Sequence, residues 1–124
     1  MYEISVRVHF DAAHALREYQ GKCENLHGHR FEIVANLRST HINNIGMVYD
    51  FVELRKQLTS IVNEFDHSYL NDQHPFDAIN PSSENIATHI FRELSKRITD
   101  PSVTVHSLEV WESPNSRVTY FPNA

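Results

Sequence analysis

The 124-residue sequence contains a single cysteine, Cys23, so no disulfide can form within the chain. Such sparing use of cysteine favours a reducing compartment, and we expect a cytoplasmic protein. Glycine occurs 3 times and proline 5 times, which excludes collagen-like and low-complexity sequences. No apolar run approaches the roughly 18 residues of a membrane span. The N-terminus starts straight into patterned sequence, without the features of a signal peptide.

Basic residues are also scarce, since 11 of them against 16 acidic residues give a formal charge of −5. A protein that neutralises nucleic-acid phosphates is usually basic, so this balance argues against such a partner. Hydrophobic residues make up 40% of the chain, which is enough for a core, and the length suits one domain spanning residues 1–124. The residue present in excess is histidine, with nine copies.

The hydrophobic pattern predicts an α+β fold. Period-two alternation indicates strands, and apolar residues at helical spacing after Asp50 and after Ser82 or Ser83 indicate two capped helices. The predicted order is strands at about 2–10 and 27–37, helices at about 51–64 and 83–98, and strands at about 103–112 and 117–121. Short connections make the four-stranded sheet antiparallel. Two helices cover only one face of it, so we expect the other face to be buried by oligomerisation.

The first chemical signal is His27-Gly28-His29. On a strand, the two histidines point to the same side and can bind one metal ion. If the first two strands pair as a hairpin, His14 lies beside them. Three neutral imidazoles with an open fourth position are typical of catalytic zinc. Cys23 is then a fourth ligand, a nucleophile or base beside the metal, or simply a small buried side chain.

Two further signals are weaker. Asp66-His67 follows the first helix, and a histidine beside a carboxylate is either a proton shuttle or an ordinary surface pair. Glu112 lies at the end of a strand, and such an isolated glutamate is usually solvated.

Together these residues resemble the 6-pyruvoyltetrahydropterin synthase family, in which the same motifs occur in the same order. The motifs that carry the resemblance are Phe10-x-Ala12-Ala13-His14, Cys23-x-x-x-His27-Gly28-His29, Gly46-Met47-Val48-x-Asp50-Phe51, Asp66-His67-x-x-Leu70-Asn71, Pro81-x-Ser83-Glu84-Asn85 and the late Glu112. The cysteine-to-histidine spacing is typical of the bacterial branch, which makes 6-carboxytetrahydropterin for queuosine biosynthesis.

The resemblance implies a tunnelling fold, with three subunits joined into a barrel, two trimers stacked into a homohexamer, and active sites at subunit interfaces. It implies that zinc is bound by His14, His27 and His29, and that the substrate is 7,8-dihydroneopterin triphosphate. Cys23 would be the general base, assisted by Asp66 and His67.

The resemblance also implies that Glu112 binds the pterin ring and that groups near Ser83 help to hold this ring. Two positions depart from the usual pattern. Ser82 replaces a threonine, and Glu24 follows the cysteine. Because some relatives use a glutamate in this loop, Glu24 leaves open a folate-directed aldolase activity, and the animal-type 6-pyruvoyl product is a further alternative.

Two alternative hypotheses place the protein outside this family. A cupin-type metal protein also uses His-x-His on a strand, but two helices here interrupt its continuous barrel. A non-catalytic zinc- or pterin-binding module would need no proton relay, so Asp66 and His67 argue against it. The triphosphate needs cations in an acidic protein, and the sequence does not choose among Arg17, Lys22 and Arg30.

Overall fold

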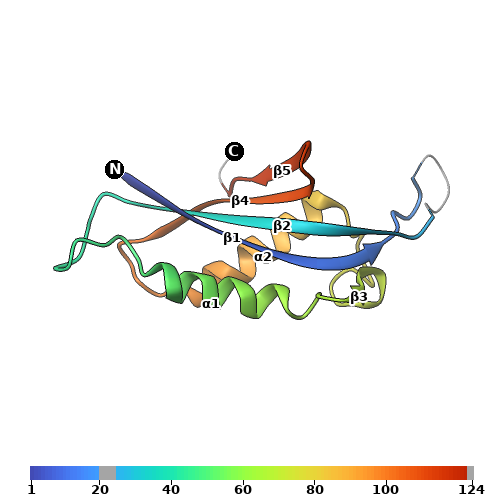
Figure 1. Ribbon diagram of the computed structural model, residues 1–124, viewed down its shortest axis with the longest axis horizontal. Helices are drawn as coiled ribbons and strands as arrows, with labels where there is room; N and C mark the ends of the chain where they lie inside the picture. Colours follow the sequence, from blue (N-terminus) through green and yellow to red (C-terminus); the bar gives the residue numbers. More distant parts are fainter. Residues whose placement is uncertain (20–24, 123–124) are drawn as a thin grey trace.

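The computed structural model describes residues 1–19 and 25–122 and confirms an α+β fold, with both helices on one side of a sheet (Figure 1). The predicted strand count is wrong. Within the described residues the sheet has five strands, in the order β3-β1-β2-β4-β5. The unpredicted strand is β3 (Ser68–Tyr69), which runs parallel to the end of β1. Its two residues are too few to show an alternating pattern, and they lie in a segment predicted as a loop.

The first two strands form a long antiparallel hairpin of β1 (Tyr2–His14) and β2 (His27–Ser39). The prediction that β1 ends at residue 10 is wrong, because backbone pairing continues until His14 lies opposite His27. Small alanines at positions 12 and 13 weaken the alternation there without interrupting the strand. The expected placement of His14 beside the start of β2 is confirmed.

The second hairpin consists of β4 (Thr104–Ser113) and β5 (Ser116–Tyr120). Its register shifts between Trp111 and Ser113, which makes Glu112 the extra residue of a β-bulge. Bulges change the direction in which a side chain points and are frequent beside active sites.

The helices begin where the sequence predicts. Asp50 accepts a hydrogen bond from the backbone N–H of Val52 (2.8 Å) and caps α1 (Phe51–Val62). Ser82 accepts one from the N–H of Asn85 (3.2 Å) and caps α2 (Ser83–Arg97). Helix α1 ends two residues earlier than expected. A short 3-10 helix, η1 (Leu70–Asp72), follows β3 inside the predicted loop.

Apolar side chains fill the space between the sheet and the helices. The fully buried ones include Phe10, Phe31, Ile33, Leu37, Leu54, Leu58, Ile61, Phe65, Phe76, Ile86 and Ile90. The opposite face is polar and carries ion pairs between Arg7 and Glu32 and between Arg38 and Glu3. Among the described residues, no helix combines the length and apolar composition that a membrane span requires.

Candidate metal centre

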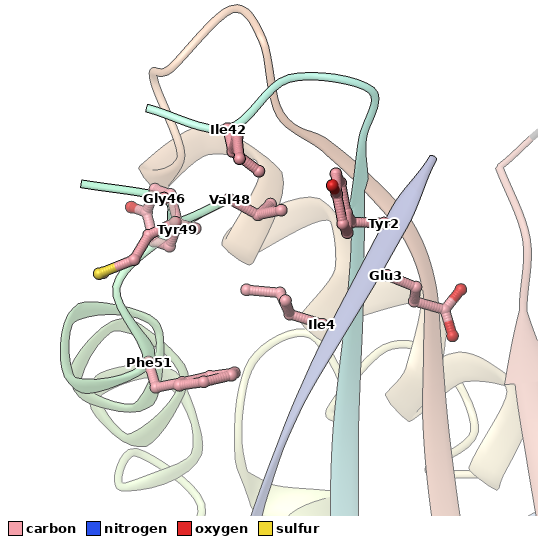
Figure 2. Close-up of a pocket in the computed structure, with 9 residues that line it drawn as sticks. Tyr2, Glu3, Ile4, Ile42, Gly46, Val48, Tyr49 and Phe51 are labelled. Carbon is pink, nitrogen blue, oxygen red and sulfur yellow. The ribbon is translucent and has the colours of Figure 1, made fainter. Parts of the chain in front are cut away.

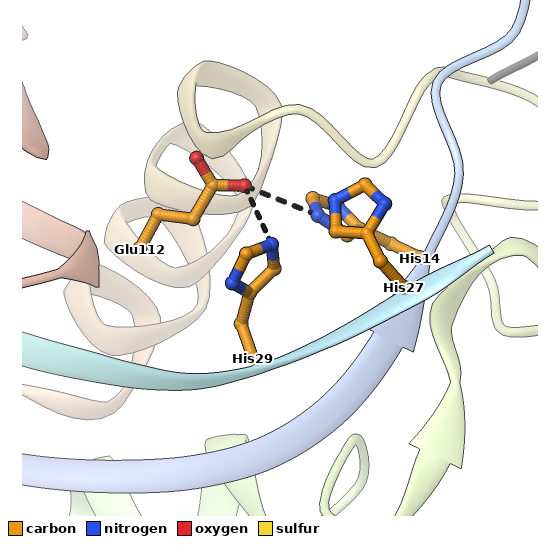
Figure 3. A group of neighbouring side chains, drawn as sticks. All are labelled: His14, His27, His29 and Glu112. Carbon is orange, nitrogen blue, oxygen red and sulfur yellow. Dashed lines mark ion pairs between the residues drawn. The ribbon is translucent and has the colours of Figure 1, made fainter. Parts of the chain in front are cut away.

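Three histidines and one glutamate meet at the end of the sheet, on the face that the helices cover. His14 comes from β1, His27 and His29 from β2, and Glu112 from the bulge of β4 (Figure 3). One ligand atom from each of the four lies within 4.8 Å of all the others. We call this group the histidine cluster. The cluster lies on the same face as the core side chains. Phe10, Ala12 and His14 share one face of β1, and His27, His29 and Phe31 share the same face of β2, because side chains alternate along a strand.

Hydrogen bonds to carbonyl groups fix how two of these imidazoles face the cluster. Nδ1 of His14 lies 2.7 Å from the carbonyl oxygen of Pro81, and Nδ1 of His27 lies 3.0 Å from that of Asn25. A carbonyl only accepts hydrogen bonds, so each Nδ1 carries the hydrogen. In the neutral rings, Nε2 therefore presents its lone pair to a metal ion. Such bonds are the usual support of metal-ligating histidines.

The buried Nε2 of His14 provides a direct test of fit. The side chain of His14 is 2% exposed, and its Nε2 makes no hydrogen bond within the described residues. A buried polar atom without a hydrogen bond destabilises a fold unless another partner satisfies it. Three imidazoles and a carboxylate are ligands that zinc favours, so the residues present fit a zinc ion.

Sequence reasoning missed the framework behind His14. The side-chain amide of Asn71 exchanges two hydrogen bonds with the backbone of Ala15 (2.8 and 3.0 Å), and Asn80 does the same with Arg17 (2.7 and 2.9 Å). The guanidinium of Arg17 also donates to the carbonyls of Asn71, Phe76 and Ile79. Of the residues in this framework, Asn71 and Pro81 belong to motifs that carry the family resemblance, whereas Arg17 and Asn80 do not. The bonds fix the segment that ends at Pro81, and so the carbonyl that orients His14.

A second group lies beside the first but faces away from it. Asp66 accepts a hydrogen bond from the backbone N–H of Asp11 (2.9 Å), and its other oxygen lies 3.0 Å from Nδ1 of His67. The N–H of His67 donates to the carbonyl of Asp11 (2.6 Å). We call Asp11, Asp66 and His67 the relay cluster. The predicted pairing of Asp66 with His67 is therefore present in the structure.

His67 is held in an unusual conformation. Its φ of +56° lies in the left-handed region, which non-glycine residues adopt mostly where the surroundings enforce it. Its side chain is 79% exposed, and the ring borders a hollow of about 440 Å³ that Asp11, Gly28 and Arg30 also line. Because Asp66 lies beside Nδ1, Nε2 is the ring nitrogen that is left to exchange a proton with another molecule.

Charges around the relay cluster keep its carboxylates ionised. Two hydrogen bonds from Arg30 (2.9 and 3.1 Å) lower the pKa of Asp11 below its ordinary value. The backbone N–H of Asp11, and after it His67, lower the pKa of Asp66. An ionised Asp66 is therefore available as an acceptor beside Nδ1 of the His67 ring.

The two clusters use opposite faces of one strand. Side chains alternate along β1, so Asp11 points to the helix-free face and His14 to the helix-covered face. Within one chain, the ring of His67 therefore does not join the histidine cluster.

The other predicted site residues stand as follows. Ser83 begins α2, two residues after the carbonyl that orients His14. Cys23 and Glu24 lie outside the described residues, as does Lys22, one of the three cations considered for the triphosphate. Of the other two, Arg17 binds backbone carbonyls and Arg30 binds Asp11.

A separate apolar cavity lies at the far end of the hairpin. It has a volume of about 320 Å³ and is lined by Tyr2, Ile4, Ile42, Val48 and Phe51, among others (Figure 2). Glu3 points away from it and pairs with Arg38. Tyr2 and His14 lie at the two ends of β1, twelve residue steps or about 40 Å of extended chain apart. The cavity thus takes no part in the chemistry of the histidine cluster.

Comparison with known proteins defines the class. The family profile described as 6-pyruvoyl tetrahydropterin synthase matches residues 3–123. A solved structure of the Caenorhabditis elegans 6-pyruvoyl tetrahydropterin synthase superposes with a TM-score of 0.86 at 28% identity, covering 98% of this chain and 96% of that one. The fold is thus the tunnelling fold that the resemblance implied, and the chain belongs to the 6-pyruvoyl tetrahydropterin synthase family, a family of lyase-type enzymes.

Curated relatives refine this placement. The chain is 37% identical to the 6-carboxy-5,6,7,8-tetrahydropterin synthase of a Synechocystis strain, over 98% of this chain and 94% of that protein. It is 32% identical to the enzyme of the same name from Rickettsia conorii, over 93% of this chain and 96% of that protein. The expected resemblance to this branch of the family is confirmed.

Proposed function

We propose that this chain is a zinc-dependent 6-carboxytetrahydropterin synthase of queuosine biosynthesis. It converts 7,8-dihydroneopterin triphosphate to 6-carboxy-5,6,7,8-tetrahydropterin, acetaldehyde and triphosphate. The observation that carries the proposal is the histidine cluster, in which the Nε2 of His14 is buried, makes no hydrogen bond within the described residues and faces the other members of the cluster. It occurs in a chain 37% identical to a synthase of that name.

In this proposal His14, His27 and His29 hold the zinc ion. When bound, zinc is a Lewis acid that makes a coordinated hydroxyl of the substrate side chain more acidic. Glu112 accepts hydrogen bonds from the 2-amino group and a ring N–H of the pterin, a charge-assisted contact that selects for this ring. Groups near Ser83 at the start of α2 help to hold it.

Proton transfer falls to Cys23 and the relay cluster. Cys23 takes a proton from the substrate carbon, and His67 exchanges that proton at Nε2. Asp66 holds Nδ1 and stabilises the charged ring, which its position 3.0 Å away supports. Because His67 faces away from the histidine cluster of its own chain, we assign it to the active site of a neighbouring copy.

The assembly proposed is a homohexamer of two stacked trimers. The sheet has two edges that invite such pairing. In the described residues, β3 covers only Ala12 and Ala13 of the outer edge of β1, and β5 is the other edge of the sheet. Unpaired strand edges are ready to pair with another chain. Joining edges between copies would also bring the helix-free face of one subunit toward the next.

The test is to incubate the zinc-loaded protein with 7,8-dihydroneopterin triphosphate and to identify the product by mass. We expect 6-carboxytetrahydropterin with acetaldehyde, and no turnover by Cys23→Ala with its zinc retained. Loss of zinc from that variant would make Cys23 a ligand and contradict the mechanism.

Other products would contradict the proposal in distinguishable ways. 6-Hydroxymethyldihydropterin would mean that Glu24 directs the chemistry toward folate, and the Glu24→Gln variant would then lose that product. A 6-pyruvoyl product would indicate the animal-type reaction. Retained zinc with no product at all would favour the binding module.

A further inference from the structure

Glu112 contacts the histidines directly, although a residue whose sole role is to hold a pterin ring needs no such contact. Its Oε1 is 3.1 Å from Nε2 of His14 and 3.3 Å from Nε2 of His29 (Figure 3). Glu112 follows the core residues Leu108 and Val110 at two-residue steps, so it points to the helix-covered face, where it remains 35% exposed. The same oxygen therefore contacts two atoms that a metal ion would use.

The short contact to His14 is not explained by a hydrogen bond. Because Nδ1 of the neutral ring holds the hydrogen toward Pro81, Nε2 presents a lone pair to the carboxylate oxygen. Two lone pairs 3.1 Å apart repel each other. A cation bound to both atoms removes the repulsion, as does a proton on the imidazole, and these two explanations predict different behaviour toward metals.

The distances are consistent with a shared cation. Zinc binds imidazole nitrogen and carboxylate oxygen at about 2.0–2.2 Å. In a tetrahedral site, two ligand atoms at that bond length lie about 3.3–3.5 Å apart. The separations of 3.1 and 3.3 Å are close to that range. Oxygen Oε1 thus lies within reach of an ion that Nε2 of His14 and Nε2 of His29 would bind.

We propose that Glu112 is the fourth metal ligand of the substrate-free enzyme, and that the pterin draws it away when substrate binds. This assignment rests on the proposed function, which gives Glu112 the pterin ring and gives the substrate hydroxyls the metal. The free site is then closed, and the arriving pterin opens the coordination position that its own side chain fills. The exposed fraction of Glu112 leaves room for this movement.

The test measures metal binding without turnover. We compare zinc affinity, by competition with a chelator, for the wild type, Glu112→Gln, Glu112→Asp and His29→Ala. The control Glu32→Gln removes the same charge from an exposed residue on the opposite face. Glu112→Gln should bind zinc about 10- to 100-fold more weakly, the range seen when supporting contacts at metal sites are lost. The control should bind as the wild type does, and His29→Ala should lose most affinity.

Cobalt(II) spectra supply the second measurement. The visible absorption of the cobalt-loaded wild type should change when neopterin is added, and that of the pterin-free Glu112→Gln variant should already differ from the wild type. Unchanged zinc affinity and an unchanged cobalt spectrum in Glu112→Gln would overturn the proposal and leave the carboxylate paired with a protonated His14. If Glu112→Gln does not fold, the same criteria apply to Glu112→Asp. Because neither readout needs turnover, a wild type that makes no pterin product would contradict the proposed function separately.

Discussion

The histidine cluster and the relay cluster lie three residues apart on β1, yet they differ in almost every physical respect. His14 is 2% exposed at its side chain and is oriented by a carbonyl, whereas His67 is 79% exposed and is held in a left-handed conformation. The first cluster collects its ligands within one chain. The second turns its ring outward, where we propose that it serves the active site of a neighbouring copy.

This difference indicates how the work of the site is divided. Binding a metal ion needs several ligands held rigidly at short distances, which a strand end with buried support provides. Proton transfer needs a ring within hydrogen-bond reach of a partner group. In the proposed division, a chain completes its metal centre on one face and offers its proton relay on the other. The following predictions test this division, beginning with the largest expected effect.

Mixing two inactive variants is the strongest test of the division. Cys23→Ala and His67→Ala should each lose about 10²- to 10⁴-fold in turnover, the usual contribution of general acid–base catalysis. Refolded together, they should regain about a quarter of wild-type activity, because random assembly puts an intact Cys23 beside an intact His67 in that fraction of sites.

The matched control mixes Asp66→Asn with His67→Ala, in which no subunit carries an intact relay. That mixture should stay inactive. If the first mixture also stays inactive, His67 acts within its own chain or has no catalytic role, and the division between the two clusters fails.

Several features of these two clusters could be predicted from sequence patterns. Alternation predicted β1 and β2 and, through their pairing, the meeting of His14 with His27 and His29, because strand geometry turns residue spacing directly into position. The caps at Asp50 and Ser82 follow from the side chains present. The pairing of Asp66 with His67 could be predicted because the two residues are adjacent in the sequence.

Other features depend on contacts that no local pattern contains. The pairing of Asp66 with the backbone of Asp11 spans 55 residues, and the two-residue β3 exists only because β1 lies beside it. Glu112 joins the histidine cluster because β4 pairs with β2, and this pairing of distant strands is not visible in the sequence around Glu112. Arg17 was one of three cations between which the sequence did not choose for the triphosphate, and its guanidinium binds three carbonyls of a distant loop.

That loop framework provides a test limited to the histidine cluster. Arg17→Ala removes the donors to three carbonyls and should lower the free energy of unfolding by about 1–3 kcal/mol. It should also weaken zinc binding several-fold, because the carbonyl of Pro81 then orients His14 less firmly. Urea denaturation of the metal-free protein and chelator competition measure the two effects.

The control for this variant is Arg38→Ala. Its exposed ion pair with Glu3 lies at the far end of the hairpin, so it should change the stability by less than about 1 kcal/mol and leave zinc affinity alone. Equal effects of the two variants on zinc binding would show that the framework does not support the metal centre.

The smallest predicted effect concerns His89, which packs against Phe65 and Phe76 at ring-centre distances of 5.7 and 5.8 Å. These two phenylalanines lie in the segment that links both clusters. Burial lowers the pKa of His89, with Glu93 and Glu64 opposing this shift and His74 and Lys96 adding to it. The folded state therefore favours the neutral ring. In the unfolded chain the ring takes up a proton near pH 6.5.

It follows that His89 stabilises the fold above about pH 6.5 and that this contribution is lost as the pH falls, because the unfolded state then binds more protons. The melting temperature of the metal-free protein should fall less between pH 7.5 and 5.5 for His89→Leu than for the wild type. The histidine cluster is the same in both proteins, so its contribution cancels in the comparison. The exposed His41→Asn should behave as the wild type does. An identical pH dependence of His89→Leu and the wild type would mean that the ring does not couple protonation to the packing beneath the two clusters.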